Sequence, residues 1–95
     1  MASAKTSVDA GRALQDAKAA TKLGQLRVSR HAEDRCDERG VTAEDVRHAV
    51  LSATAAEWNP EESTWSLLGG TDIDGDLLVA VVAVVGNTVR LVTVF

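Results

Sequence analysis

The alternation of apolar and polar residues divides the chain into a helix-patterned first half and a strand-patterned second half. Residues 8–23 are rich in Ala, Lys, Leu and Gln, which favours a helix with a thin apolar stripe, and Gly24 is suited to end it. Residues 25–28 are expected to form a short strand or an extended entry. Apolar residues then recur at helical spacing between Val46 and Ala53, and we expect them to face the core.

Local capping signals delimit two helices in the middle of the chain. Ser29 is suited to cap the N-terminus of a helix over residues 30–39, and Gly40 to end it in the left-handed conformation. Thr42 with Asp45 three residues later resembles a capping box with Asp in place of Glu, so the next helix is predicted to begin there.

The second half of the chain predicts an antiparallel meander of at least three strands. A continuous apolar run at residues 77–85 is typical of a strand buried on both faces. Asp74-Gly75, just before it, is a strong hairpin signal. The predicted strands span residues 63–73, which Gly69-Gly70 would distort, 77–85 and 89–94, with tight turns at Asn59-Pro60 and Gly86-Asn87. Helices followed by strands predict an α+β fold.

The length of 95 residues allows one domain with one modest core. We expect residues 25–95 to form this single α+β domain and residues 1–24 to supply a tail and an extra helix, which packs on the domain or on a partner. Only 3% of the residues are aromatic, so the core must be largely aliphatic. Trp58 and Trp65 are expected to belong to this core, although either has a side chain that can stack on a nucleic-acid base.

Cysteine usage and hydropathy exclude several classes of protein. Cys36 is the single cysteine, which excludes an internal disulfide and a multi-cysteine metal site. His31, Asp34 and Glu38 lack the paired-histidine spacing of common metal sites. The N-terminus has no apolar run typical of a signal peptide, and residues 77–85 are too few to span a bilayer. We therefore expect a cytoplasmic protein with no membrane partner, no metal and no cofactor.

The net charge of −4 is unevenly distributed. Residues 1–25 have a net charge of +2 and residues 26–54 a net charge of −1, whereas residues 55–95 carry six acids against Arg90. An acidic protein does not favour nonspecific nucleic-acid binding, which depends on neutralising phosphates. Any binding of phosphate must therefore be local, in the arginine-rich middle of the chain.

His31, Arg35 and Arg39 form the one constellation that suggests catalysis. Their i, i+4, i+8 spacing places all three on one face of the helix predicted over residues 30–39. The helix N-terminus disfavours a protonated imidazole, so His31 is suited to act as a general base. Arg35 and Arg39 are suited to bind a phosphate and to stabilise charge that develops on phosphorus. Alternatively, His31 hydrogen-bonds the sheet and Arg35 pairs with an acid and ties the helices together, so that the row is purely architectural.

The segment SRHAEDRCDERGVTAEDV, from Ser29 to Val46, resembles the signature of a bacterial family, domain of unknown function 4258. The resemblance covers residues 26–95 and leaves residues 1–24 outside. It implies the fold of RelE-like and ParE-like toxins and barnase-like nucleases, with N-terminal helices packed on an antiparallel sheet of three to five strands. It also implies that His31, Arg35 and Arg39 are motif positions, that Gly40 makes the turn, and that Thr93 is a further candidate on the last strand.

Two functional hypotheses follow. The first is a toxin-like ribonuclease that cleaves RNA without a metal, with His31 as general base, Arg35 and Arg39 as phosphate ligands, and Thr93 at the site. The acidic charge and the lack of Tyr depart from a typical ribosome-dependent ribonuclease. The second hypothesis is a non-catalytic protein-binding module of a toxin-antitoxin or similar system. An acidic sheet would then dock a basic partner, and the N-terminal helix would bind a cognate protein or a second copy of the chain.

Overall fold

The structure, a computed structural model, describes residues 5–95, which form three helices and one five-stranded sheet. The predicted α+β fold is therefore confirmed, and the first four residues of the predicted tail lie outside the described residues. In chain order the elements are α1 (Ser7–Lys22), β1 (Arg27–Val28), α2 (Arg30–Arg39), α3 (Ala43–Ser52), β2 (Ala55–Asn59), β3 (Thr64–Leu68), β4 (Ala80–Val85) and β5 (Thr88–Val94).

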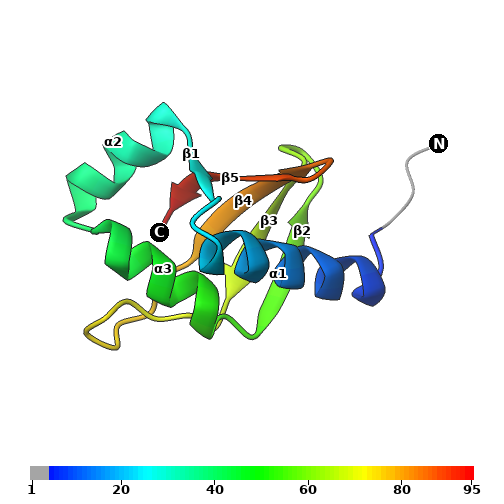
Figure 1. The fold of residues 1–95 in the computed structure, drawn as a ribbon, viewed down its shortest axis with the longest axis horizontal. Helices are drawn as coiled ribbons and strands as arrows, with labels where there is room; N and C mark the ends of the chain where they lie inside the picture. The colour runs from blue at the N-terminus through cyan, green and yellow to red at the C-terminus, as the bar shows by residue number, and fades with distance from the viewer. Residues whose placement is uncertain (1–4) are drawn as a thin grey trace.

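The sheet has the strand order β1-β5-β4-β3-β2 and is mostly antiparallel. Strands β2 to β5 form a meander in which each strand pairs with the next along the chain. β1 adds to the far edge in parallel with β5, with Val28 opposite Leu91. The long-range pairing of β1 with β5 thus joins the first half of the chain to its last strand (Figure 1).

The predicted capping signals form the helix ends. The Ser29 hydroxyl accepts a hydrogen bond from the backbone N–H of Ala32 at the start of α2, and Gly40 ends α2 with φ of 66°. Thr42 and Asp45 form a complete capping box at the start of α3, with the Asp45 carboxylate accepting from the Thr42 N–H. These confirmed predictions share a cause, because a cap depends on side chains within one turn of the helix end.

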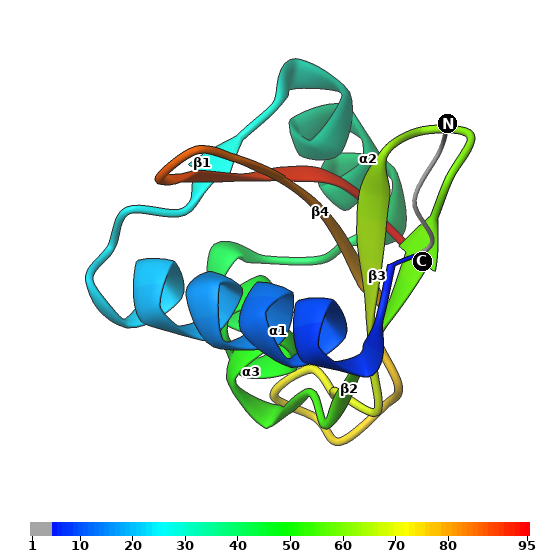
Figure 2. The same ribbon diagram turned by 90° about the vertical axis from the view of Figure 1, so that its right-hand side faces the viewer.

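α1 belongs to the same core as the rest of the chain. It lies against the face of the sheet that we call the inner face, where Leu67, Leu91 and Val94 are fully buried. Ala13 and Ala17 of α1 are also buried in this core, and their small side chains let the helix approach the strands closely. Figures 1 and 2 show α1 and α3 together on one side of β4 and β5, and α2 beside the end of β5.

The two tryptophans occupy the core, as predicted. Trp65 is 6% exposed in β3, and Trp58 is half-buried opposite it in β2. Their ring centroids lie 5.0 Å apart with an interplanar angle of 56°, a tilted arrangement that aromatic pairs favour. The Lys5 ammonium group lies 4.8 Å from the centroid of the Trp58 ring.

The strand predicted over residues 63–73 ends much earlier, at Leu68. The chain turns here because it packs against the end of α3. Thr54 donates its backbone N–H to the Leu68 carbonyl oxygen, and a Cβ on Gly70 would overlap the carbonyl oxygen of Ala49 in α3. Gly69, with φ of 84°, makes the turn that this contact requires.

A loop over residues 69–79 joins β3 to β4, so the strand predicted over 77–85 begins only at Ala80. Its first four residues, Ala80 to Ala83, are buried as the apolar run predicted. The Asp74-Gly75 signal marks a turn at the tip of the loop. There the Asp72 carboxylate accepts hydrogen bonds from the backbone N–H groups of Asp74 and Asp76.

β2 is a strand that the sequence did not predict. Its sequence, Ala-Ala-Glu-Trp-Asn, has little intrinsic β-propensity at its start. It is extended because it pairs along its whole length with β3, from Ala55 opposite Leu68 to Asn59 opposite Thr64. The Asn59 amide also donates to the hydroxyl groups of Thr64 and Ser66 on β3.

Candidate functional site

The structure places His31, Arg35 and Arg39 along the same helix, α2, as predicted from their spacing. His31 and Arg39 are exposed at its two ends, and within residues 5–95 neither side chain makes a hydrogen bond or an ion pair. The Arg35 side chain is 40% exposed and forms an ion pair with Glu38, with the guanidinium nitrogen 3.5 Å from the carboxylate oxygen. The architectural alternative expects a pair that ties the helices together, whereas this pair lies within α2, and at the surface such pairs stabilise little.

His31 faces away from a cavity that α2 helps to form. Ala32 is fully buried and Cys36 is half-buried against the core, so these residues define the inner side of the helix. Glu33 and Asp37 follow on one flank and line the cavity. At 3.6 residues per turn, His31 lies about 200° around the helix from Glu33, on the opposite flank. His31 therefore lies on an open surface of α2, and Arg39 is exposed at the end of the helix.

Thr93 lies on β5, on the face of the sheet opposite the core. Its register partner is Val81, whereas the neighbouring pair, Val94 and Ala80, is fully buried in the core. Thr93 is half-buried, and no hydrogen bond in residues 5–95 joins its side chain to His31. The structure thus brings the row together on one helix without linking Thr93 to it.

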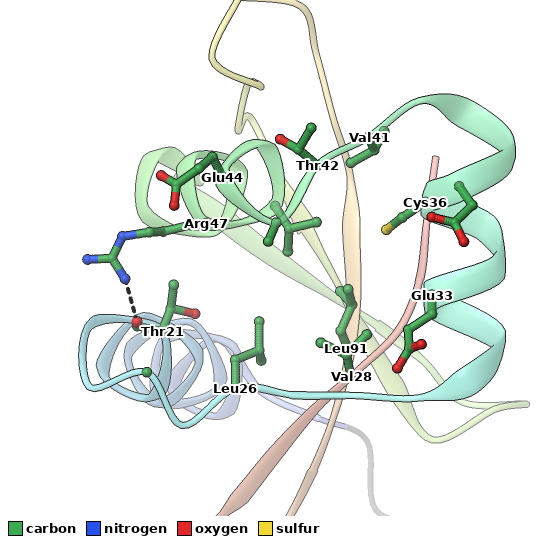
Figure 3. A pocket seen from close by; sticks show the side chains of 14 residues that line it. Thr21, Leu26, Val28, Glu33, Cys36, Val41, Thr42, Glu44, Arg47 and Leu91 are labelled. Atoms are coloured by element: carbon green, nitrogen blue, oxygen red, sulfur yellow. Dashed lines mark hydrogen bonds between the residues drawn. The ribbon is translucent and has the colours of Figure 1, made fainter.

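The cavity, which we call the cleft, has a volume of about 650 Å³ and opens between the three helices and β1 (Figure 3). Its lining comes from the end of α1, the α1–β1 connection, β1, α2, the α2–α3 connection, α3 and β5. The residues are Thr21, Gly24, Leu26, Val28, Glu33, Cys36, Asp37, Val41, Thr42, Ala43, Glu44, Val46, Arg47 and Leu91.

The interior of the cleft is aliphatic. Leu91 and Val46 are buried at its base, and Leu26 and Val41 are half-buried beside them. Val28 of β1 remains 45% exposed, although it is apolar. An apolar group from a ligand would therefore find an apolar surface here, and removing that surface from water is favourable by about 25 cal/mol per Å².

Three carboxylates surround this apolar interior. Glu33 and Asp37 lie one turn apart on α2, and Glu44 lies in the first turn of α3. All three are exposed, and within residues 5–95 none of them forms an ion pair. The one basic residue of the lining, Arg47, donates a hydrogen bond of 2.7 Å to the Thr21 carbonyl oxygen at the end of α1. The mouth of the cleft is therefore negatively charged.

Cys36 supplies a thiol at the wall of the cleft. Burial raises the pKa of this thiol, and the neighbouring Asp37 carboxylate raises it further. The thiol is thus held protonated at neutral pH, which makes it a poor nucleophile. Within residues 5–95 no group of three or more His, Cys, Asp or Glu side chains is arranged to hold a metal ion.

His48 has a structural role on α3 and does not line the cleft. Its Nδ1 lies 2.7 Å from the Thr71 carbonyl oxygen, to which it donates a hydrogen bond. The Asp45 carboxylate, on the same helix, accepts from the Ile73 N–H at 3.2 Å. The Thr42 and Ile73 N–H groups hold the pKa of Asp45 below its ordinary value. Both side chains tie the loop between β3 and β4 to α3.

The acidic charge of residues 55–95 lies at the ends of the sheet rather than on its face. Glu57 is the one acid of this segment that lies in a strand. The other five acids lie in two connecting loops: Glu61 and Glu62 between β2 and β3, and Asp72, Asp74 and Asp76 between β3 and β4. The predicted acidic sheet surface is thus divided between two loops and an edge strand.

The cleft could not be predicted from the sequence, because its lining comes from elements that are distant along the chain. Its one local signal is the i, i+4 pair Glu33 and Asp37 on the flank opposite the row of His31. The base depends on Leu91, which is brought beside Val28 by the parallel pairing of β1 with β5. That pairing cannot be read from either segment alone.

Comparison with known proteins gives one match. The model of the family described as Domain of unknown function (DUF4258) matches residues 28–95. The match spans all of the sheet except Arg27, together with α2 and α3, and α1 lies outside it. No curated protein and no solved structure matches the chain. Within residues 5–95 the structure contains no helix long and apolar enough to cross a membrane.

Proposed function

Because the chain belongs to the DUF4258 family, whose description assigns no function, we propose from the geometry that it is a non-catalytic protein-binding module. The observation that carries the proposal is the cleft, an aliphatic cavity of about 650 Å³ bordered by three unpaired carboxylates. This combination suits a protein segment that presents apolar side chains beside lysines or arginines.

The two parts of the cleft have different roles in binding. The aliphatic interior supplies affinity, because apolar side chains that enter it leave water. The carboxylates of Glu33, Asp37 and Glu44 favour a basic partner and speed its approach, and they disfavour acidic competitors. The net charge of −4 acts in the same direction at longer range.

Selection of binding peptides tests this proposal directly. A display library of short random peptides is panned on the full chain, and binding of the enriched sequences is measured by fluorescence anisotropy. We expect apolar and basic residues to be enriched. We also expect bound peptide to slow the reaction of Cys36 with a thiol reagent, since Cys36 lines the cleft.

Two triple variants with the same change in charge separate the cleft from general electrostatic attraction. Neutralising the cleft should weaken peptide binding about tenfold, because each partly exposed ion pair contributes a factor of about two or three. Neutralising three exposed acids elsewhere should change it less than about twofold. The cleft variant is Glu33→Gln, Asp37→Asn, Glu44→Gln, and the control is Glu57→Gln, Glu61→Gln, Glu62→Gln. Equal effects in both variants, or failure to select any peptide that protects Cys36, would refute the proposal.

RNA cleavage is the second candidate function, and one observation favours it. The side chains of His31 and Arg39 are exposed and uncommitted within residues 5–95, on the same helix as Arg35. The RelE- and ParE-like grouping implied by the sequence resemblance supports the same reaction, with Thr93 as a further candidate. Incubation of the chain with RNA in metal-free buffer tests it. Cleavage that His31→Ala abolishes would establish the activity, and cleavage that is absent or unchanged in the variant would end it.

A further inference from the structure

We infer that the cleft takes its partner as an extended strand that pairs with the free edge of β1, with basic residues placed beside the cleft carboxylates. This inference rests on the proposed function and specifies the shape of the partner. Extended peptides commonly bind by adding a strand to an exposed sheet edge.

The first observation is the position of β1 in the sheet. β1 is the last strand at its edge, and it pairs only with β5. Alternate residues of a parallel strand direct both backbone groups toward the same neighbour. The Ser29 N–H donates to the Leu91 carbonyl oxygen at 3.0 Å, so Ser29 and Arg27 face β5. The N–H and C=O groups of Val28 therefore point away from β5, to the open edge.

The second observation is that this open edge borders the cleft. Leu26 and Val28 both line it, and Val28 is 45% exposed despite its apolar side chain. In Figure 3, β1 runs along one side of the cleft, with α2 and its Glu33 side chain at one end. A strand laid along β1 would thus have backbone partners beside an apolar surface.

The short length of β1 and the carboxylates around the cleft define the length and charge of the segment that would bind. β1 has only two residues, so the added strand needs only three or four residues, about 10–13 Å at the rise of a β-strand. Side chains alternate in direction along such a strand. One set would enter the aliphatic cleft, and basic residues flanking that set would reach Glu33, Asp37 or Glu44. A short segment with one or two large aliphatic residues flanked by Lys or Arg fits this arrangement.

The alternation of backbone groups gives a test that other binding modes would not pass. Peptides selected on the full chain are resynthesised with a single N-methyl group at each amide in turn. Methylation of the amide that pairs with Val28 should weaken binding about tenfold or more, since it removes a hydrogen bond and introduces a clash. Methylation of either adjacent amide should change binding less than about threefold, because that amide points away from β1.

A pair of protein variants checks the same contact from the other side. Val28→Pro removes the free N–H without removing a hydrogen bond to β5, and proline is tolerated at sheet edges. Val28→Ala removes side-chain area and keeps the N–H. We expect Val28→Pro to weaken peptide binding at least about tenfold more than Val28→Ala does. Thermal melting of both variants shows whether the sheet is retained. If Val28→Pro does not fold, the N-methyl peptide series measured on the unaltered protein decides whether the partner pairs with β1.

The outcomes separate this inference from the proposed function. One outcome is that selected peptides protect Cys36 and bind the cleft triple variant more weakly, but that methylation weakens binding equally at every amide or at none. This outcome would leave the binding function standing and overturn the inference of an added strand. Selected peptides that bind the cleft as helices would likewise leave the binding function standing and overturn the inference of an added strand. Failure to select any peptide that protects Cys36 would overturn both. Dimerisation of the free chain that Val28→Pro abolishes would identify a second copy as the occupant and overturn the assignment to a basic partner.

Discussion

Replacing Gly70 with alanine should destabilise the fold because of a single added methyl group. Gly70 has no positive φ, so backbone strain plays no part. A Cβ at this position would overlap the carbonyl oxygen of Ala49, and this oxygen belongs to the α3 backbone and cannot rotate aside. The loop must therefore move away from the helix.

The magnitude follows from what that movement costs. Overpacking a tight contact costs about 1–3 kcal/mol. The moving segment carries two hydrogen bonds of 3.0 Å, from Thr71 N–H to the Ser52 hydroxyl and from Leu78 N–H to the Gly70 carbonyl oxygen. Weakening either costs about 1 kcal/mol more. We expect the free energy of unfolding to fall by about 2–4 kcal/mol.

Urea denaturation followed by tryptophan fluorescence measures this change, because Trp58 and Trp65 are packed in the core. Gly11→Ala is the matched control. A Cβ on Gly11 meets nothing within 4 Å, and Gly11 lies inside α1, so this variant should be stabilised by about 0.5–1 kcal/mol. If Gly70→Ala stays within about 0.5 kcal/mol of the wild type, the close packing of the loop against α3 is not rigid and the reasoning fails.

Three further predictions concern charge, reactivity and the base of the cleft. The pKa of Asp45 is lowered in the folded state, so the stability that its carboxylate supplies is present above about pH 4 and is lost as the pH falls. Asp45→Asn should therefore flatten the acid side of the stability curve measured in urea between neutral and acid pH, and an unchanged slope would contradict this. Cys36 should react with a thiol reagent more slowly than free cysteine, and Asp37→Asn should speed the reaction by lowering the thiol pKa; a slower variant would contradict the cause given. Leu91→Ala should cost about 2–5 kcal/mol in urea denaturation, because Leu91 is fully buried, and a loss under about 1 kcal/mol would show that the core collapses around it.

Sequence predicted those parts of the fold whose causes are local. The ends of α2 and α3 depend on Ser29, Gly40 and Thr42, each acting within one turn of its helix, and these predictions are confirmed. β2 was missed because it is held extended by β3, and its own Ala-Ala-Glu start gives no strand signal. The true end of β3 was missed because it depends on the contact of Gly70 with α3, which is a tertiary cause.

The same distinction applies to the candidate site. The spacing of His31, Arg35 and Arg39 was enough to predict that they share one helix, but not what that helix flank would face. The cleft lies on the other flank, and its base requires Leu91, more than sixty residues further along the chain than Val28. The charge along the sequence did indicate an acidic molecule. The three carboxylates at the cleft, however, come from the arginine-rich middle of the chain, where the arginines nearly cancel the negative charge of the acids.

The parallel pairing of β1 with β5 affects the order in which the chain can fold during its synthesis on the ribosome. Ser29 is held both by the Leu91 carbonyl oxygen and, through its hydroxyl, by the Val92 carbonyl oxygen at 3.3 Å. During synthesis these acceptors leave the ribosome after every residue of α1, α2 and α3. The helices can therefore form early, but β1 has no strand to pair with until β5 emerges. A ribosome stalled before β5 would carry a nascent chain whose cleft lacks Leu91 at its base and whose β1 is unpaired, so a partner that binds along β1 would bind only after β5 has been made.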